Sequence, residues 1–238
     1  NGTNDVPTID SATNPAAIDE VSGDSSAQNI PATTGTITFT DQDLGDSLTL
    51  SVTGDASASY TPNGGSSGEI PTNADVDISS LIASGAISFD QSGLTSDGGQ
   101  QTINWTYDPD AADLDWLQDG DTLTLTYTAQ ITDGAGNVGE QDLVITINGT
   151  NDVPTIDSAT NPAAITEIAG DSSAQGIAAT GNISFTDQDL GDSLTLSVTG
   201  NATATYNGCL VYTSDAADDS SLIAIGAIPF DQTSLTSD

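Results

Sequence analysis

Residues 122–133 read TLTLTYTAQITD, which is the clearest strand pattern in the chain. Every second side chain in it is apolar or aromatic, namely Leu123, Leu125, Tyr127, Ala129 and Ile131, and the positions between them hold Thr or Gln. Successive side chains of a β-strand point to opposite faces. An alternation with a period of two, made of good strand formers, therefore predicts a half-buried strand.

The same alternation recurs along the first 147 residues. Apolar positions are spaced by two in four more segments: Ile37 and Phe39; Leu48, Leu50 and Val52; Ile103, Trp105 and Tyr107; Leu143, Ile145 and Ile147. One apolar face and one hydroxyl-rich face are typical of strands in an antiparallel β-sandwich. Trp105 lies in phase with an apolar strand face, so we expect it and Trp116 in the core. We also expect one short helix over residues 109–118, with Asp108 as N-cap and Pro109 at its first position.

An internal repeat sets the domain organisation. Residues 1–18 (NGTNDVPTIDSATNPAAI) recur without change at 148–165, an offset of 147, and residues 40–54 (TDQDLGDSLTLSVTG) recur at 186–200. We therefore predict two tandem immunoglobulin- or cadherin-like sandwiches, 1–147 complete and 148–238 truncated.

The second copy departs from the first in two respects. It contains no counterpart of residues 98–147, and the segment 208–219 (GCLVYTSDAADD) does not match the first copy. We interpret that segment, which holds the lone Cys209, as a local divergence. The sequence begins with Asn1, and we take it as an internal piece of a longer protein.

The composition excludes several classes of partner and site. The 238 residues include no Lys, Arg or His, and 31 Asp with 4 Glu give a formal net charge of −35. A chain without cationic side chains cannot neutralise phosphates, so we expect no nucleic-acid partner. No apolar stretch is long enough to cross a bilayer, so we expect no membrane insertion. Ser–His–Asp catalysis and zinc sites are excluded, and of the enzyme classes only a carboxylate-pair glycoside hydrolase remains open.

The preference for Asp over Glu points to metal binding in loops. The loop after residues 36–40 carries Asp41, Asp43 and Asp46, and the second copy repeats it as Asp187, Asp189 and Asp192. Residues two apart in an extended chain point the same way, and Gly45 lets the chain turn back toward them. Three converging carboxylates suit calcium, which takes 6–8 oxygen ligands. An acidic turn held by its own hydrogen bonds is the alternative interpretation.

The junction between the copies adds further oxygen ligands. It reads NGTNDVP at 148–154, with Asn151 and Asp152, and Asn4 and Asp5 stand at the same positions ahead of the first copy. Asn and Asp at a link between sandwiches resemble the calcium-binding linker of cadherins. That resemblance adds Asp133, in the turn before the junction, and Glu167 after it as candidate ligands.

These motifs together resemble the VCBS repeat. They are the NGTNDVP junction, the TDQDLGD loop, the INWTY stretch at 103–107 and the TDGAG turn at 132–136. The family occurs in very large secreted bacterial adhesins, often exported by type I secretion. The resemblance implies a calcium-stabilised, cadherin-like module at the cell surface, with roles in adhesion and biofilm formation.

We therefore expect a non-catalytic extender whose partners are neighbouring copies of the repeat. Contacts with glycans or with host and biofilm surfaces are expected through other parts of the parent protein. Two alternatives stay open: a sandwich that itself binds a carbohydrate or a protein, and a fragment of a carboxylate-based glycoside hydrolase.

Overall fold

The computed structural model describes residues 2–24, 26–72, 76–91, 93–205 and 235–236. It forms two compact units. The first unit comprises Asn1–Asp152 together with Gln188–Gly191, and the second comprises Val153–Asp187 and Asp192–Asp238. The divergent segment 208–219, with Cys209, lies outside the described residues, as does the resumed repeat from 221 onward except for residues 235 and 236.

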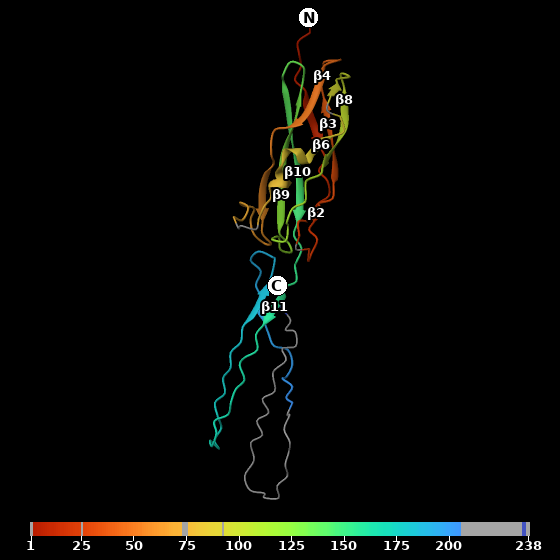
Figure 1. Ribbon diagram of the computed structural model, residues 1–238. Helices are drawn as coiled ribbons and strands as arrows, with labels where there is room; N and C mark the ends of the chain where they lie inside the picture. Colours follow the sequence, from red (N-terminus) through yellow and green to blue (C-terminus); the bar gives the residue numbers. More distant parts are fainter. Residues whose placement is uncertain (1, 25, 73–75, 92, 206–234, 237–238) are drawn as a thin grey trace. The chain divides into compact units, whose positions relative to one another are not determined.

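Two β-sheets build the first unit (Figure 1). The four-stranded sheet has the order β1 (Thr8–Ala12), β3 (Thr33–Thr40), β8 (Gln100–Tyr107) and β6 (Ile87–Phe89). The six-stranded sheet runs β2 (Ile18–Asp19), β10 (Val138–Asn148), β9 (Thr122–Thr132), β4 (Ser47–Val52) and β7 (Gly93–Thr95), and β5 (Ser57–Thr61) also pairs with β9. The predicted all-β, immunoglobulin-like sandwich is confirmed. Its strand pairs are antiparallel except for β2 and β10, which pair in parallel.

Strand β9 is the centre of the six-stranded sheet. It pairs with β10 along its whole length, from Thr122 opposite Asn148 to Thr132 opposite Val138. On its other side it pairs with β4 and β5. The five apolar positions predicted to face inward are completely buried, and the residues between them are half-buried. Alternation in the sequence therefore identified the inward face of the central strand correctly.

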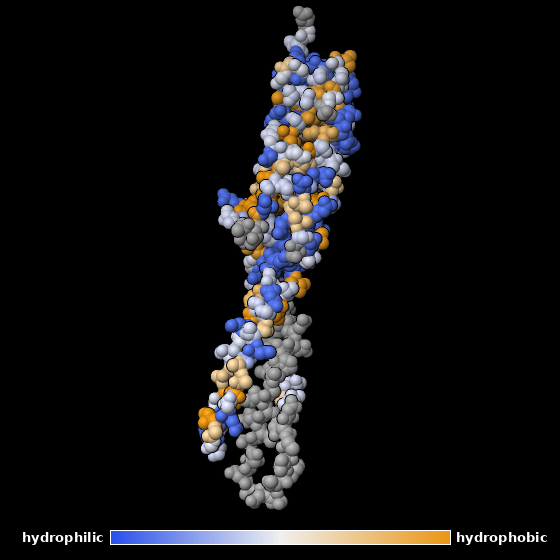
Figure 2. Space-filling view, in the orientation of Figure 1, coloured by the Kyte–Doolittle hydropathy of each residue, from blue (hydrophilic) through white to orange (hydrophobic). Residues whose placement is uncertain are grey.

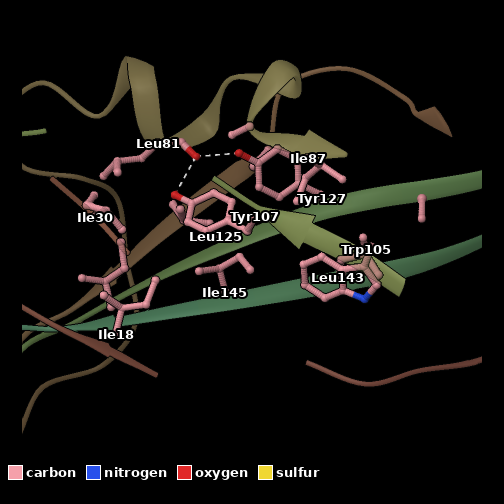
Figure 3. Packing of buried hydrophobic residues seen from close by; sticks show 14 of the residues in the cluster. Ile18, Ile30, Leu81, Ile87, Trp105, Tyr107, Leu125, Tyr127, Leu143 and Ile145 are labelled. Carbon is pink, nitrogen blue, oxygen red and sulfur yellow. Dashed lines mark hydrogen bonds between the residues drawn. The ribbon is translucent and has the colours of Figure 1, made fainter. Parts of the chain in front are cut away.

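The core lies between the sheets and is closed by a short helical segment (Figure 3). Trp105 is completely buried and Trp116 is 4 % exposed, as expected. The hydroxyls of Tyr107 and Tyr127 both donate hydrogen bonds to the carbonyl oxygen of Leu81, in helix α1 (Ser79–Ile82). A 3₁₀ turn, η1 (Ser84–Ala86), follows. These bonds satisfy two hydroxyls that burial would otherwise leave unpaired.

The outer faces of the strands are rich in hydroxyl groups. Thr38 and Thr102, on neighbouring strands, lie with their hydroxyl oxygens 3.1 Å apart, and those of Thr13 and Thr36 lie 2.8 Å apart. On the visible face of the first unit, hydrophilic residues are interspersed with small apolar spots (Figure 2). The surface is therefore polar but has no cationic side chain to offset its carboxylates, because the sequence contains no Lys, Arg or His.

The helix predicted over residues 109–118 is wrong. Ala112 instead forms an isolated β-bridge with Gln28, whose backbone groups exchange hydrogen bonds of 2.7 and 3.1 Å with it. The Asp113 carboxylate caps the amide of Asp115 in a turn. Leu114, Trp116 and Leu117 are all buried, so this segment has no continuous polar face to present to solvent as a helix.

The second unit contains only short strand pairs in its described part. β11 (Thr155–Ala159) pairs with β12 (Ile183–Thr186), and β13 (Thr195–Leu196) pairs with β14 (Leu235–Thr236). Phe185 is 45 % exposed, whereas its first-copy counterpart Phe39 is completely buried. Leu196 is 48 % exposed against 4 % for Leu50. Phe185 and Leu196, whose counterparts lie in the core of the first unit, are thus open to solvent in the second unit.

Candidate metal centres

One acidic cluster lies at the end of the first unit where β3 leads into β4. We call it the head set, and its members are Asn4, Asp5, Asp41, Asp43, Asp46 and Asp133. Its central loop is held by hydrogen bonds from Ser96. The Ser96 hydroxyl donates to the Asp41 carbonyl at 2.7 Å, and the Ser96 carbonyl accepts from Gly45 at 2.8 Å. Gly45 has φ +91°, which only glycine adopts without strain, so the chain can turn back as the sequence predicts.

The N-terminal segment and the 133–137 turn complete the head set. The Asn4 side-chain amide donates to the Asp133 carboxylate at 2.7 Å, and the Asp5 amide donates to the Asp43 carboxylate. Desolvation raises the pKa of Asp133, but hydrogen bonds from Asn137, Asn4 and the backbone of the turn outweigh it and lower that pKa to about 2. Asp133 is therefore ionised at neutral pH.

The head set holds more negative charge than its own donors can satisfy. Desolvation raises the pKa of Asp46, and three neighbouring carboxylates raise it further, those of Asp41, Asp43 and Asp133. One carboxylate oxygen of Asp41 and one of Asp46 are buried and accept no hydrogen bond from the described residues. Burial of an unpaired charge is costly, so these oxygens favour a bound cation.

A second cluster lies at the other end of the first unit. We call it the tail set: Glu20, Asp115, Asp152 and Asp189. The carboxylates of Glu20, Asp115 and Asp152 each place an oxygen within 4.8 Å of the other two, and all three residues are buried, with exposures of 4, 4 and 2 %. The Asp189 carboxylate accepts the Asp152 amide at 2.7 Å. Four buried carboxylates thus converge in the first unit.

Backbone pairing brings the tail set together. Asp19 pairs with Asn148 in the parallel β2–β10 ladder, which places Glu20 beside the junction. Thr150 then donates its amide to Glu20 at 2.8 Å, and Gly23 donates to Asp152. The Gln28 side chain donates to Asp115 at 3.2 Å.

The tail set is electrostatically strained without a cation. Desolvation raises the pKa of Glu20 to about 8, against an opposing hydrogen bond from Thr150, and neighbouring carboxylates add to the shift. Desolvation and the charge of Asp113 raise the pKa of Asp115 to about 6. One oxygen of Glu20 and one of Asp152 are buried, and within the described part of the chain neither accepts a hydrogen bond. These two oxygens can take metal-ligand bonds.

The loop 187–192 repeats the acidic loop of the first copy. Within it, Asp187, Asp189 and Asp192 each place an oxygen within 4.8 Å of the other two. In the described ranges this loop and the tail triad are the two groups that meet this distance, and Asp41, Asp43 and Asp46 do not meet it. The contact from Asp152 to Asp189 has its counterpart in the contact from Asp5 to Asp43.

The structure corrects the expected ligand sets in two respects. Asp133 was expected to join Asn151 and Asp152, but it lies with Asn4 at the opposite end of β9. That strand has eleven residues, so its ends are ~35 Å apart. Glu167 is exposed, and its first-copy counterpart Glu20 belongs to the tail set. Asn151 donates its side-chain amide to the carbonyl of Asp152.

Sequence reasoning missed Glu20 and Asp115. The 147-residue offset could have indicated Glu20, because it relates Glu20 to the predicted ligand Glu167. Asp115 had no such signal, since the residues around it were interpreted as a helix.

Comparisons with known proteins leave the family open. No protein-family model matches the sequence, and no curated protein matches it. A solved PapD-like domain of human CEP192 is 9 % identical, with 58 % of this chain and 83 % of that one covered and a TM-score of 0.29. The CooA pilin subunit from enterotoxigenic Escherichia coli is 13 % identical, with 61 % and 99 % covered and a TM-score of 0.31. Among the described residues, no helix is long and apolar enough to span a membrane.

Proposed function

We propose that this chain is a calcium-binding extender module that links copies of itself into a secreted, surface-attached adhesin. The observation that carries the proposal is the pair of acidic sets at the two ends of one sandwich, each with buried carboxylate oxygens that no donor satisfies. The sequence has no side-chain cation to neutralise them. A metal ion is therefore the natural counter-charge.

Calcium suits these sets better than other common metals. Their ligand atoms are carboxylate and amide oxygens, which hard cations prefer, and the chain has no His and a single Cys for softer metals. Magnesium keeps several waters and requires near-octahedral geometry, whereas calcium accepts 6–8 oxygens in flexible arrangements. Buried carboxylates contributed by several separate loops fit the calcium preference.

The placement of the sets supports a linking role. Asp5 of the head set and Asp152 of the tail set are the same residue of the repeat, 147 positions apart. Each junction therefore combines Glu20 and Asp115 of one copy with the linker and the acidic loop of the next copy. An ion at that position would neutralise opposing carboxylates and join consecutive copies, as expected for an extender.

The experiment is thermal unfolding of residues 1–238 in EDTA and in calcium. Extracellular calcium sites often have Kd values of 10⁻⁴–10⁻³ M, so ~10 mM calcium should stabilise the folded chain by roughly 1.5–3 kcal/mol per site. Asp43→Asn and Asp152→Asn should each remove part of this gain. Equal midpoints in EDTA and calcium would exclude the proposal.

Asp171→Asn is the matched control. It removes the same charge, but Asp171 is exposed and its carboxylate caps only Ser173. Asp24 is a weaker control, because its charge contributes to the raised pKa of Asp115 in the tail set.

A further inference from the structure

One identical sequence lies in two different environments. Residues 40–54 and 186–200 are the same fifteen letters, so Leu44 and Leu190 are equivalent. Leu44 is 81 % exposed. Leu190 is half-buried and packs against the hydrophobic core of the first unit, to which the segment Gln188–Gly191 belongs. The difference cannot come from local sequence, so it comes from what each loop contacts.

Leu190 contacts a small group of residues in the first unit. Its amide donates to the Trp116 carbonyl at 3.4 Å, and the Gln118 side-chain amide donates to its carbonyl. Trp116 packs against the ring of Tyr60, with centroids 5.5 Å apart. The Tyr60 hydroxyl donates to Asp121. We call these four residues of the first unit, Tyr60, Trp116, Gln118 and Asp121, the tail platform.

The tail platform is also held by hydrogen bonds that do not involve Leu190. The Asp121 carboxylate accepts hydrogen bonds from the amides of Asn63 and Gln118, at 2.7 and 3.2 Å, as well as from Tyr60. The Asp121 carbonyl accepts the Gly149 amide at 3.0 Å. Asp121 thus joins Asn63 and Gly149, which are far apart in sequence.

Two glycine pairs show the same contrast as the leucines. A Cβ on Gly149 would lie 2.2 Å from the Gln118 carbonyl oxygen, whereas a Cβ on the equivalent Gly2 would meet nothing within 4 Å. A Cβ on Gly191 would lie 3.2 Å from the Gln118 side-chain nitrogen, whereas one on Gly45 would also meet nothing. Positions 149, 190 and 191 therefore have close neighbours around Gln118. The equivalent positions 2, 44 and 45, at the end that holds the head set, are open.

We propose that Leu44 is a docking knob that packs on the tail platform of another copy of this repeat. The partner follows from the structure, because Leu190 makes that contact in the first unit. The proposal rests on the extender function for its partner, but the contact consists of a leucine side chain and two hydrogen bonds, with no metal ligand among them. It gives each junction a fixed register in addition to an ion.

Hydrogen exchange in the full chain tests the contact between Leu190 and the tail platform. Leu190→Ser should raise exchange of the Leu117, Asp121 and Gly149 amides by roughly tenfold, since burying a leucine contributes on that order. Leu44→Ser makes the same change in the same sequence and should leave those amides unchanged. An unchanged Leu190→Ser chain, or equal effects of the two variants, would overturn the proposal.

Docking of Leu44 on a preceding copy is tested by placing one further copy of residues 1–147 ahead of the full chain. In that protein, Leu44→Ser should raise exchange at the platform of the added copy by the same factor. If those amides do not respond, Leu44 does not dock on a neighbouring copy. Both series are run in calcium and in EDTA. If the variants raise amide exchange in EDTA as well, the leucine contact does not depend on calcium. The calcium proposal is tested separately, by thermal unfolding.

Discussion

A buried carboxylate changes its role according to whether a cation is present. Glu20 is 4 % exposed and its neighbours in the tail set are Asp115 and Asp152. Without a metal ion it can relieve this environment only by taking up a proton, which is what its raised pKa describes. With calcium bound, the same carboxylate is stabilised in its ionised form. On the proposed function, protons and calcium therefore compete for one residue.

This competition predicts how stability depends on pH in EDTA. Burial raises the pKa of Glu20 from 4.5 to about 8, so its contribution is fully present below pH ~4.5 and is lost as pH rises through about 8. Asp115, with a pKa raised to about 6, has the same sign over a lower range. Each pKa unit corresponds to ~1.4 kcal/mol, so melting midpoints should fall clearly between pH 5 and pH 8.5. Calcium should flatten or reverse this fall.

Two variants check the assignment to Glu20. Glu20→Gln should reduce the fall in EDTA, because a neutral amide replaces the titrating group at constant shape. Glu140→Gln should not, since Glu140 is exposed and its carboxylate accepts only the Gln130 side-chain amide. A midpoint in EDTA that rises from pH 5 to pH 8.5 would contradict the prediction.

Elements whose hydrophobic period reaches the core could be predicted from the sequence. β9 and β3 follow their alternation closely, because one face of each strand packs against the opposite sheet. The segment 109–118 could not be predicted in this way. Its conformation is set by the Gln28–Ala112 bridge, a contact with a segment 84 residues earlier, and a local helix signal was the wrong guide.

The strands of the first unit also predict how residues 148–238 behave when isolated. This piece contains no counterpart of β8, β9 or β10, which supply Trp105, Tyr127 and Ile145 to the core. Its apolar residues would have no opposite sheet to cover them, as the exposure of Phe185 and Leu196 already indicates. We expect the isolated piece to show no cooperative thermal transition. Protected amides across residues 183–198 would contradict this.

At the scale of the whole molecule, the repeat explains which parts of the site were predictable. The acidic loop and the junction each lie within a few residues, so their oxygens could be found from spacing alone. Glu20 and Asp115 are 95 residues apart in sequence, and only the β2–β10 pairing and the Gln28 side chain bring them together. A ligand set assembled from three separate segments requires the fold before it can be recognised.

The last prediction concerns the mechanics of a chain with two complete copies. Calcium should narrow the range of orientations at the junction 148–154, because an ion bound by the linker and by an acidic loop adds a second link between the two copies. Without it, the carboxylates repel, and only the contact with the tail platform restrains the copies. Small-angle scattering should show a narrow, rod-like distance distribution in calcium.

Sodium chloride at ~0.5 M shortens the Debye length to under ~5 Å and weakens repulsion without coordination, so it should not produce that profile. Asp152→Asn and Asp189→Asn should each retain the broad calcium-free distribution even in calcium. Identical profiles in the two salts would show that the junction is only an acidic linker.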